Sequence, residues 1–588
     1  MNQITTEVLV VGGGVGGTAA AIQAARMGAQ VTLVSEFAWL GGMLTTAGVT
    51  APDGNELDAW RTGLWGAFLT ELIQRHPEGL DHGWVSFFTY DPRTGAEIFA
   101  DWVKALPNLT WIQGQTPQSV LRDRDRILGV QFENYEIQAQ IILDGTELGD
   151  LLALGDIPHR WGWEFQAEFN EPSAPKEPNA TTDRYPIQAP TWVVVMQDFG
   201  PGTTAPPIPA PQNYDPTPFA AAWKNYGLEK CLDYGRLLGD RFMINWPIHG
   251  NDYGEGVERL VGNAADRAAF FEEARQYSQG FAHYIQSVDR RYGLAEGTFD
   301  TPNSAFAFHP YYRESRRLIG LTTIREQDLL PIFGGQTAAL PITTSASGCE
   351  NVEQCCDAIA IGNYANDHHY PSGDIPLAPK SIRWGGRWTG TPFTIPYRSL
   401  VPKNIDGFLA CEKNISTSHM SNGATRLQPC VFGIGQAAGA AAALCVKHAC
   451  QPRDLPINAL QTALLTDSIA PNAIIPLFNL PPHHPDWLQW QQYYLEHCGS
   501  YPGNGYAPSP IQAASLTQPT SAPFSGQFLQ NGPQDYSLAI DSTDLWQLVT
   551  TDAAIDGALS MYKIRHKLQI IGRKNAAGRW ILVEKILS

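Results

Sequence analysis

The sequence lacks the features that mark several classes of protein. It contains no basic block, and its 58 acidic residues exceed its 40 basic ones, which gives a net charge of −18 over 588 residues. This balance excludes nucleic acid and anionic membranes as expected partners. The longest small and apolar run, residues 437–446, is far shorter than the roughly 20 residues of a membrane helix. We therefore expect a soluble protein.

Cysteine is scarce and irregularly spaced. The nine cysteines are an odd number and form no C-x-x-C motif. Cys349, Cys355 and Cys356 cluster, but their spacing matches no standard metal or iron–sulfur pattern, so we expect reduced thiols and no metal site. The N-terminus has no basic region followed by an apolar core, which predicts no secretory signal and a cytoplasmic location.

A glycine cluster near the N-terminus is the first chemical signal. In "VLVVGGGVGGTAAA", a short apolar strand leads into Gly12, Gly14 and Gly17 at G-x-G-x-x-G spacing, and small helix formers follow. Gly12 allows a tight turn, Gly14 lets backbone approach a pyrophosphate, and Gly17 lets the helix pack on the strand. The free N–H groups of the helix N-terminus favour an anion there.

The next strand supports the same interpretation. Residues 31–35 form a second apolar strand, and Glu36 follows it, 24 residues after Gly12. An acidic residue at this spacing is typical of a carboxylate that binds an adenosine ribose. Strand, turn, helix, second strand and terminal acid together predict a dinucleotide site rather than an isolated glycine turn.

The rest of the chain divides by pattern. A meander is predicted over 119–143, helices over 58–75, 266–290 and 351–364, and a hairpin within 567–585. We predict an α/β fold: a discontinuous Rossmann-like nucleotide-binding domain, an inserted α+β substrate or cap domain, and a small C-terminal module. The expected boundaries are 1–160 for the first part of the nucleotide domain, 161–390 for the insertion, 391–465 for the second part, 466–534 for a linker region and 535–588 for the module.

Several separate stretches together resemble the FAD-dependent oxidoreductases that share the glutathione-reductase-type fold. They are "GGGVGGTAAAIQAARMGAQVTLVSE", "WLGGMLT", "DGTELGDLLALGDIPHRWGWE", "YYRESRRLIG" and "IPYRSLVPKNIDGFLACEKNISTSHMSNGATRLQPCVFGIGQAAGAAAAL". They extend over roughly residues 5–465, and the last is more specific than a glycine turn. The resemblance implies FAD as cofactor. No histidine lies between Trp39 and Thr46 to hold it covalently, so dissociable FAD is expected.

The resemblance also implies which residues contact the cofactor. They are Gly12, Gly14, Gly16, Gly17 and Glu36 for the ADP half; Gly41, Gly42 and Met43 beside the ribityl chain and flavin; Asp144, Gly145 and Thr146 in a turn that closes over the cofactor; and Gly435, Gln436 and Ala437, whose N–H groups would face the pyrimidine edge.

A shorter stretch points to a catalytic arginine. "SNGATRLQ" resembles the "HGANRLGG" stretch of succinate dehydrogenase and fumarate reductase flavoproteins, whose arginine lies at the active site. This implies Arg426 as a catalytic residue that anchors a substrate anion or the reduced flavin. Two departures separate the chain from those enzymes: Asn422 stands where they have histidine, and "QPCV" replaces "GGNS".

Histidine is the natural base for the proton that accompanies hydride transfer. We favour His369, with Asp367 two residues before it, and His419, just before the helix that follows Arg426. Arg313 in "HPYYRESRRLIG" is a further candidate. On a helix it would share a face with Arg316 or Arg317 and could clamp a carboxylate, but the pair Arg313 and Arg317 with Glu314 equally suits a structural ion network.

The sequence therefore predicts an FAD-dependent dehydrogenase or oxidase that passes hydride from a small polar organic molecule to flavin N5. No second G-x-G-x-x-G follows a strand, so a nicotinamide-using reductase is not expected. Two alternatives remain: a non-catalytic FAD-binding protein, and a carbohydrate-binding protein that uses the aromatic insertion. Trp161, Trp163, Trp192, Trp384 and Trp388 would then line a substrate wall.

Overall fold

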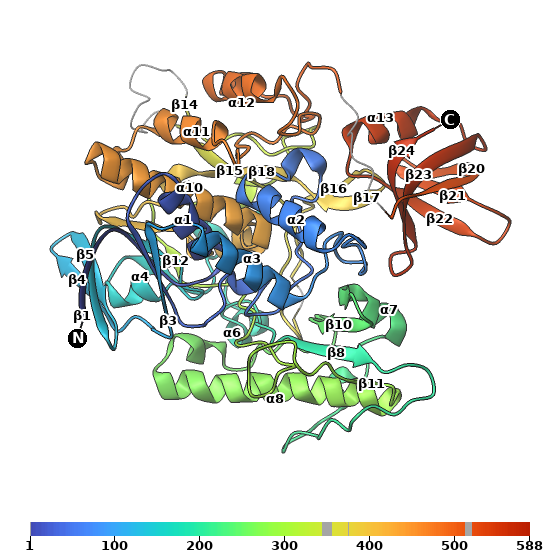
Figure 1. Ribbon diagram of the computed structural model, residues 1–588, viewed down its shortest axis with the longest axis horizontal. Coiled ribbons are helices and arrows are strands. Elements are labelled where there is room, and N and C mark those ends of the chain that lie inside the picture. Colours follow the sequence, from blue (N-terminus) through green and yellow to red (C-terminus); the bar gives the residue numbers. More distant parts are fainter. Residues whose placement is uncertain (1, 344–354, 374, 512–519, 588) are drawn as a thin grey trace.

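The computed structural model describes residues 2–343, 355–373, 375–511 and 520–587. Its centre is a sheet with the order β3-β2-β1-β6-β5-β4, and β19 also pairs with β6 (Figure 1). The strands are β1 (Asn2–Val11), β2 (Val31–Ser35), β3 (Leu109–Gln113), β4 (Ser119–Asp123), β5 (Arg126–Gln131), β6 (Tyr135–Asp144) and β19 (Phe408–Ala410). β3, β2, β1, β6 and β19 run parallel, whereas β4 and β5 form the predicted meander with β6.

Two helices of small residues cover this sheet. α1 (Val15–Arg26) follows β1, and α10 (Gln428–His448) returns from far along the chain to lie against it. A Cβ on Gly435 would lie 2.2 Å from the carbonyl oxygen of Gly16, and one on Gly439 would lie 2.2 Å from that of Ala20. The glycines therefore let the two helix backbones approach closely. The nucleotide fold is thus discontinuous, as predicted.

α10 is also the one helix in the described part of the chain that is long and apolar enough to cross a membrane. Most of it is buried inside the protein, however, as expected of a core helix. The other helices of the body are α2 (Gly63–Arg75), α3 (Pro92–Lys104), α4 (Asp150–Leu154), α5 (Gln166–Phe169), α6 (Ala180–Arg184), α7 (Leu228–Leu232), α8 (Ala264–Val288), α9 (His419–Thr425), α11 (Ile457–Leu465) and α12 (Trp487–Glu496).

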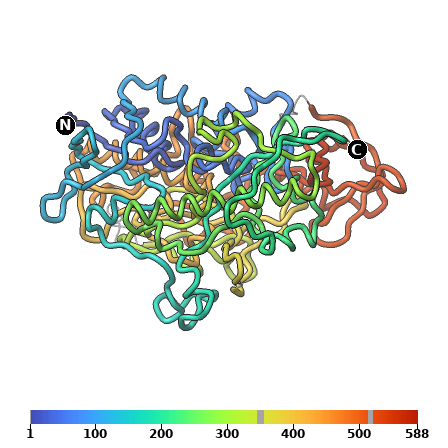
Figure 2. The backbone as a smooth tube through the Cα atoms, turned by 90° about the horizontal axis from the view of Figure 1, so that it is seen from below, coloured from blue at the N-terminus to red at the C-terminus, as the bar shows by residue number. Residues whose placement is uncertain are grey.

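The insertion is built on a second sheet of order β11-β8-β10-β9, which is antiparallel. Its strands are β8 (Val194–Asp198), β9 (Arg236–Leu237), β10 (Arg241–Ile244) and β11 (Tyr292–Leu294). The long helix α8 packs along this sheet at the edge of the molecule, and its bounds are close to the predicted 266–290 (Figures 1 and 2).

The helix predicted over 351–364 is wrong for residues 355–364, the part of that range that the structure describes. Residues 351–354 lie outside the described range, but β14 (Cys355–Cys356) and β15 (Ala358–Asn363) are strands. β15 pairs with β18 (Pro392–Pro396), and all six of its residues are buried. A short apolar run that is buried on both faces fits a strand as well as a helix. Pairing with β18 therefore decided that this run is a strand. Cys355 is disulfide-bonded, so the expectation of reduced thiols is wrong there.

The C-terminal module is a closed barrel with its own small core. Its order is β20-β21-β22-β24-β23, with α13 (Ala553–Met561) inserted after β22. Its strands are β20 (Ala522–Gly532), β21 (Asp535–Ala539), β22 (Leu545–Val549), β23 (Lys567–Asn575) and β24 (Trp580–Ile586). β23 and β24 are the predicted hairpin. In Figure 1 the barrel lies at one end of the molecule.

The predicted linker, 466–534, is wrong on two counts. The barrel begins at Ala522, because β20 closes it by pairing with both β21 and β23. Upstream, residues 472–480 are buried in the main core, and α12 follows them. The prolines of this stretch predicted an irregular backbone, but its apolar side chains still pack against the main core. The hairpin of β16 (Ser381–Trp384) and β17 (Arg387–Gly390) contacts the barrel, and Arg387 stacks over the Trp580 ring at 4.8 Å.

Candidate functional site

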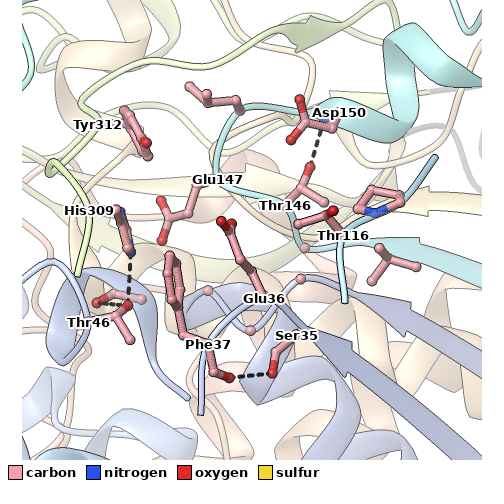
Figure 3. Close-up of a pocket in the computed structure, with 18 of the residues that line it drawn as sticks. Ser35, Glu36, Phe37, Thr46, Thr116, Thr146, Glu147, Asp150, His309 and Tyr312 are labelled. Carbon is pink, nitrogen blue, oxygen red and sulfur yellow. Dashed lines mark hydrogen bonds between the residues drawn. The ribbon is translucent and has the colours of Figure 1, made fainter. Parts of the chain in front are cut away.

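A cavity of about 580 Å³ opens at the carboxyl ends of β1, β2 and β6. Its walls include Gly12, Gly13 and Gly14, which join β1 to α1, and Gly145, which follows β6. Glu36, Phe37, Glu147 and His309 also line it, and Figure 3 shows the side chains of this group gathered around one space. Ligands of open α/β sheets bind at this edge of the strands.

The glycine turn is tightly packed, as the motif predicts. Gly12 has a φ of +105°, and a Cβ there would lie 2.2 Å from the carbonyl oxygen of Gly145. A Cβ on Gly17 would lie 2.1 Å from the carbonyl oxygen of Gly12, so this glycine lets α1 pack on the turn. Gly16 meets β19 and α10 instead of the cavity, because a Cβ there would lie 1.8 Å from the Cys411 carbonyl oxygen.

Glu36 lies where the ribose carboxylate is expected. It directly follows β2, its side chain is exposed to the cavity, and Asp150 lies nearby on the same wall. Partial burial and the charge of Asp150 raise the pKa of Glu36. Asp150 is itself bound by Arg267 and Arg316, each with a 3.1 Å contact to Oδ1. This wall therefore combines acceptors for hydroxyl groups with two cations.

The predicted closing turn is held by Asp144. Its Oδ1 accepts hydrogen bonds from the backbone N–H of Thr146 at 3.0 Å and from its hydroxyl at 2.6 Å. Asp144 is fully buried, and burial raises its pKa to about 7. Asp144 thus shapes the turn, while Gly145 and Thr146 form the cavity wall.

Glu412 and Lys413 were missed by the sequence reasoning. Both follow β19 and are fully buried. Glu412 Oε2 accepts a 2.7 Å hydrogen bond from the Gly16 N–H in the first turn of α1. Lys413 Nζ lies 3.2 Å from Glu412 Oε1 and also contacts Glu147, whose Oε1 has no hydrogen-bond partner among the described residues. The one sequence signal that could have predicted their role is an acidic residue directly after β19, the strand that pairs with β6.

The opposite end of the cavity carries a histidine. His309 Nδ1 lies 2.8 Å from the Pro310 carbonyl oxygen, and Nε2 lies 2.9 Å from the Thr46 hydroxyl (Figure 3). Because a carbonyl only accepts, the ring proton is assigned to Nδ1, and Nε2 accepts from Thr46. Burial lowers the pKa of His309, which favours this neutral form. Phe37 stacks on the ring at 5.1 Å.

The loop predicted to pass beside the flavin reaches the cavity through Gly42. Gly41 has a φ of +103° and packs against Phe99, and its N–H donates to the Gly13 carbonyl at 2.9 Å. Met43 is fully buried in the core. Gly41 and Met43 therefore position the loop, whereas Gly42 faces the space.

The role predicted for Gly435, Gln436 and Ala437 is wrong as stated. α10 begins at Gln428, so these residues lie two turns inside it and their N–H groups belong to the helix. Gly435 packs against Gly16, and the Gln436 side chain accepts from the Leu64 N–H and donates to the Ala470 carbonyl. The small-residue pattern marks helix packing here.

Three of the four predicted catalytic residues meet in one buried chain of charges, away from the cavity lining. Arg426 lies 3.0 Å from Asp367, His369 lies 2.9 Å from the same Asp367 oxygen and 2.6 Å from Asp252, and Arg313 lies 3.1 Å from Asp252. The predicted pairing of His369 with Asp367 is confirmed. Although burial raises it, His369 and Arg426 hold the pKa of Asp367 well below its usual value.

The segment from His309 to Arg313 separates this chain of charges from the cavity. His309 and Tyr312 line the cavity, whereas the Tyr311 hydroxyl accepts a 2.6 Å hydrogen bond from Arg426. The segment around Arg313 is not helical, since Tyr311 pairs in a β-bridge with Thr191, so the helix face considered above for Arg313 with Arg316 or Arg317 is not formed. Farther along, Arg317 binds Glu164 and Glu314, so the Arg317 part of the predicted ion network with Glu314 is formed, whereas Arg313 pairs with Asp252 instead.

His419 lies in a third part of the structure, apart from the cavity and from the chain of charges. Its Nδ1 lies 2.9 Å from Glu314, its Nε2 lies 2.6 Å from the Tyr370 hydroxyl, and the Trp163 ring lies 3.8 Å from it. It reaches neither the cavity nor His369. The tryptophan wall is also not formed, since Trp384 stacks on Phe478 and Trp388 is 66% exposed.

Comparison with known proteins shows which family the sequence matches. A family model for FAD-dependent oxidoreductases matches residues 7–464. No curated protein matches the chain. Among solved structures, L-proline dehydrogenase from P. horikoshii has 17% identity, with 28% of this chain and 25% of that chain covered and a TM-score of 0.16.

Two further structures are similar over the same limited extent. The p-nitrophenol 4-monooxygenase PnpA from Pseudomonas putida DLL-E4 has 12% identity over 34% of this chain and 49% of its own, with a TM-score of 0.21. Thioredoxin reductase from T. acidophilum has 17% identity over 28% of this chain and 40% of its own, with a TM-score of 0.16. The chain thus spans half or less of the length of each of the three.

Proposed function

The chain belongs to the FAD-dependent oxidoreductase family, and we propose that it transfers hydride from a small polar organic molecule to FAD held non-covalently in the glycine-lined cavity. The observation that carries the proposal is the joint placement of Gly12, Gly14 and Glu36 on one cavity wall at the ends of β1 and β2. An acceptor other than nicotinamide, such as oxygen, would then reoxidise the cofactor.

The residues present fit FAD. The Gly12–Gly14 backbone has no Cβ to fill the cradle, and a Cβ on Gly14 would lie 2.7 Å from Glu412 and 3.3 Å from Glu147. Glu36 accepts hydrogen bonds and suits the ribose diol. The first turn of α1 suits a pyrophosphate, because its N–H groups favour an anion. The unpartnered Glu147 Oε1 suits a hydroxyl donor of the cofactor.

When bound, the flavin supplies a two-electron acceptor. The chain's own task is to bind the substrate, to exclude water and to remove the proton that leaves with the hydride. His369 and Asp367 are our candidates for this proton, since they share a 2.9 Å contact and the Asp367 side chain is 38% exposed. Arg426 would hold Asp367 ionised and in place.

The test is an absorption spectrum of the protein loaded with FAD, followed by anaerobic addition of amino acids, sugars and hydroxy acids. Flavin bands near ~450 nm that bleach with one compound would support the proposal, because reduction removes this absorption. Bound FAD that no compound reduces would favour the non-catalytic alternative. Sugar binding that persists without FAD would favour a carbohydrate-binding protein.

A further inference from the structure

Part of the wall of the cofactor cavity comes from the inserted domain. Val261, Gly262, Arg267 and Phe271 line the same cavity as Glu36. Arg267 and Phe271 lie four residues apart on α8, so their side chains project from one face of this helix. The insertion, which the sequence predicts as a substrate or cap domain, therefore also borders the space assigned to the cofactor.

The guanidinium group of Arg267 is held in place by the protein. Its Nε donates to the Leu260 carbonyl at 2.8 Å, and its Nη2 lies 3.1 Å from Asp150 Oδ1. Asp150 begins α4 in the nucleotide-binding domain, so this ion pair joins the two domains at the cavity wall. Because Nε and Nη2 are already fixed, Arg267 loses little further side-chain freedom when a ligand binds.

The remaining nitrogen of Arg267 is available to a ligand. Nη1 makes no hydrogen bond within the described part of the chain, and the side chain is 30% exposed. Arg316 is the other arginine of this wall, but its side chain is only 9% exposed. Its Nη1 donates to the Leu148 carbonyl at 2.9 Å, and its Nη2 lies 3.5 Å from the Val261 carbonyl oxygen. Of the two arginines, Arg267 is therefore the one with a free donor at the cavity.

Arg267 lies at the end of the cavity where the adenosine ribose is expected. It contacts Asp150, and Figure 3 shows Asp150 and Glu36 bordering the same space. Burial and the charge of Asp150 raise the pKa of Glu36, and the charge of Arg267 opposes this rise. The guanidinium group is thus close to the carboxylate that is proposed to bind the ribose.

The charges of the cavity wall show why a cation is needed there. Among the described residues, the carboxylates that line the cavity are Glu36, Glu147 and Asp150. Without basic side chains beside them, these acids would repel the pyrophosphate of a dinucleotide. An arginine offsets this repulsion, and its planar guanidinium group donates charge-assisted hydrogen bonds to phosphate oxygens.

We propose that the inserted domain supplies part of the cofactor site, and that Arg267 is its binding residue for the ADP half of FAD, a nucleoside diphosphate. Asp150 and the Leu260 carbonyl position the guanidinium group, and Nη1 is the donor for an oxygen of the ADP half. This inference rests on the proposed placement of FAD in this cavity, but not on hydride transfer or on the substrate. Cofactor affinity then depends on α8 as well as on the glycine turn.

The experiment titrates the full-length, FAD-free protein with FAD and, separately, with ADP by isothermal titration calorimetry. Arg267→Gln should weaken both ligands by the same factor, about 10-fold, because it removes a charge-assisted hydrogen bond to a group that they share. Added salt should weaken FAD binding less in this variant than in wild type, since the variant lacks a charge that salt screens. Arg275→Gln is the matched control, because Arg275 also lies on α8 but pairs with Glu272 and does not line the cavity.

Several results would overturn the assignment. One is an unchanged affinity of Arg267→Gln for FAD and ADP, and another is an equal loss in Arg275→Gln. A loss of FAD affinity without a loss of ADP affinity would also do so, because Arg267 would then act on the flavin half. Asp150 keeps its contact with Arg316 in the variant, so the melting temperature of FAD-free Arg267→Gln should match that of Arg275→Gln.

The placement of FAD is tested separately by Gly14→Ala and Glu36→Ala. If these variants weaken FAD binding and Arg267→Gln does not, only the role of Arg267 fails. If none of the three weakens it, the proposed cofactor site fails as well. Arg267→Lys is the conservative variant: it keeps the charge but loses the guanidinium fork, so its affinity for both ligands should lie between those of Arg267→Gln and wild type.

Discussion

Glu412 Oε2 accepts a 2.7 Å hydrogen bond from the backbone N–H of Gly16. A buried carboxylate from the end of β19 thus caps the first turn of α1, where its charge is favoured by the helix dipole. Lys413 lies between Glu412 and Glu147, so the end of α1 carries two acids and one base. A pyrophosphate at the first turn of α1, as proposed above, would have to share or replace these contacts.

The pH dependence of protein stability should reveal the titration of the Glu412 carboxyl group. Burial raises its pKa to about 7, despite Lys413. The folded protein therefore binds more protons than the unfolded chain between about pH 4.5 and 7, and this contribution to stability is lost as the pH rises through that window. Glu412→Gln does not titrate, so its melting temperature relative to wild type should rise by about 1–3 °C from pH 5 to pH 8.

This is measured on FAD-free protein by thermal unfolding at each pH. Glu133→Gln serves as the control, because Glu133 is exposed in the turn between β5 and β6. A difference between Glu412→Gln and wild type that is the same at both pH values would contradict the prediction.

Gly12→Ala and Gly14→Ala should fail in different ways. At Gly12, with φ +105°, a Cβ would meet backbone at 2.2 Å, so Gly12→Ala should lower the free energy of unfolding by about 2 kcal/mol or more. At Gly14, with no positive φ, the nearest contact of a Cβ is a side-chain atom, Glu412 Oε2 at 2.7 Å, and the Gly145 carbonyl oxygen follows at 3.1 Å. Gly14→Ala should therefore fold but bind FAD at least about 10-fold more weakly.

Denaturant unfolding and FAD titration separate the two outcomes. Gly557→Ala in α13 is the control, because nothing lies within 4 Å of its added Cβ. If Gly14→Ala binds FAD like wild type, the cradle does not receive the pyrophosphate.

Glu36→Ala should weaken FAD binding about 10-fold without a loss of stability. Removing the carboxylate removes an acceptor for the ribose hydroxyls, and hydrogen bonds to charged groups contribute about 1.5–3 kcal/mol. The side chain is exposed, so unfolding by denaturant should match wild type. Isothermal titration with FAD gives the Kd, and Glu133→Ala is the control. An unchanged Kd would remove Glu36 from the site.

Asp252→Asn should destabilise the protein by about 3 kcal/mol. Asp252 is buried between Arg313 and His369, so its loss leaves a buried guanidinium unpaired. Glu255→Gln is the matched control, because Glu255 pairs with Arg184 on the surface, where both side chains are 52% exposed, and should cost less than about 1 kcal/mol. Equal losses in denaturant unfolding would mean that the buried network contributes no more than a surface pair.

Local sequence pattern was sufficient for the elements of the nucleotide fold. β1, α1 and β2 follow from a buried β-branched run, a glycine turn and small helix formers, all within residues 8–35. The meander β4 to β6, the helix α10 and the hairpin of β23 and β24 were predicted for the same reason. Their hydrophobic periodicity and turn residues lie close together in the chain.

The same reasoning failed where long-range partners decide. Residues 358–363 form β15 because they pair with β18, and Tyr311 lies in a β-bridge with Thr191 instead of a helix. Glu412 carried no local motif, since its partner Gly16 lies 396 residues away. Gly435 was predicted as a cofactor contact, but small residues are also typical of close helix packing, which is its role here.

The sequence by itself determined β1, α1 and β2, the glycine turn between β1 and α1, and the position of Glu36 directly after β2, because these features lie within residues 2–36. Only the tertiary structure decided that Arg426 joins the pair of His369 and Asp367 in one network and that His309 faces the cavity. These groups come from segments far apart in the chain, and only packing brings such side chains within hydrogen-bonding distance.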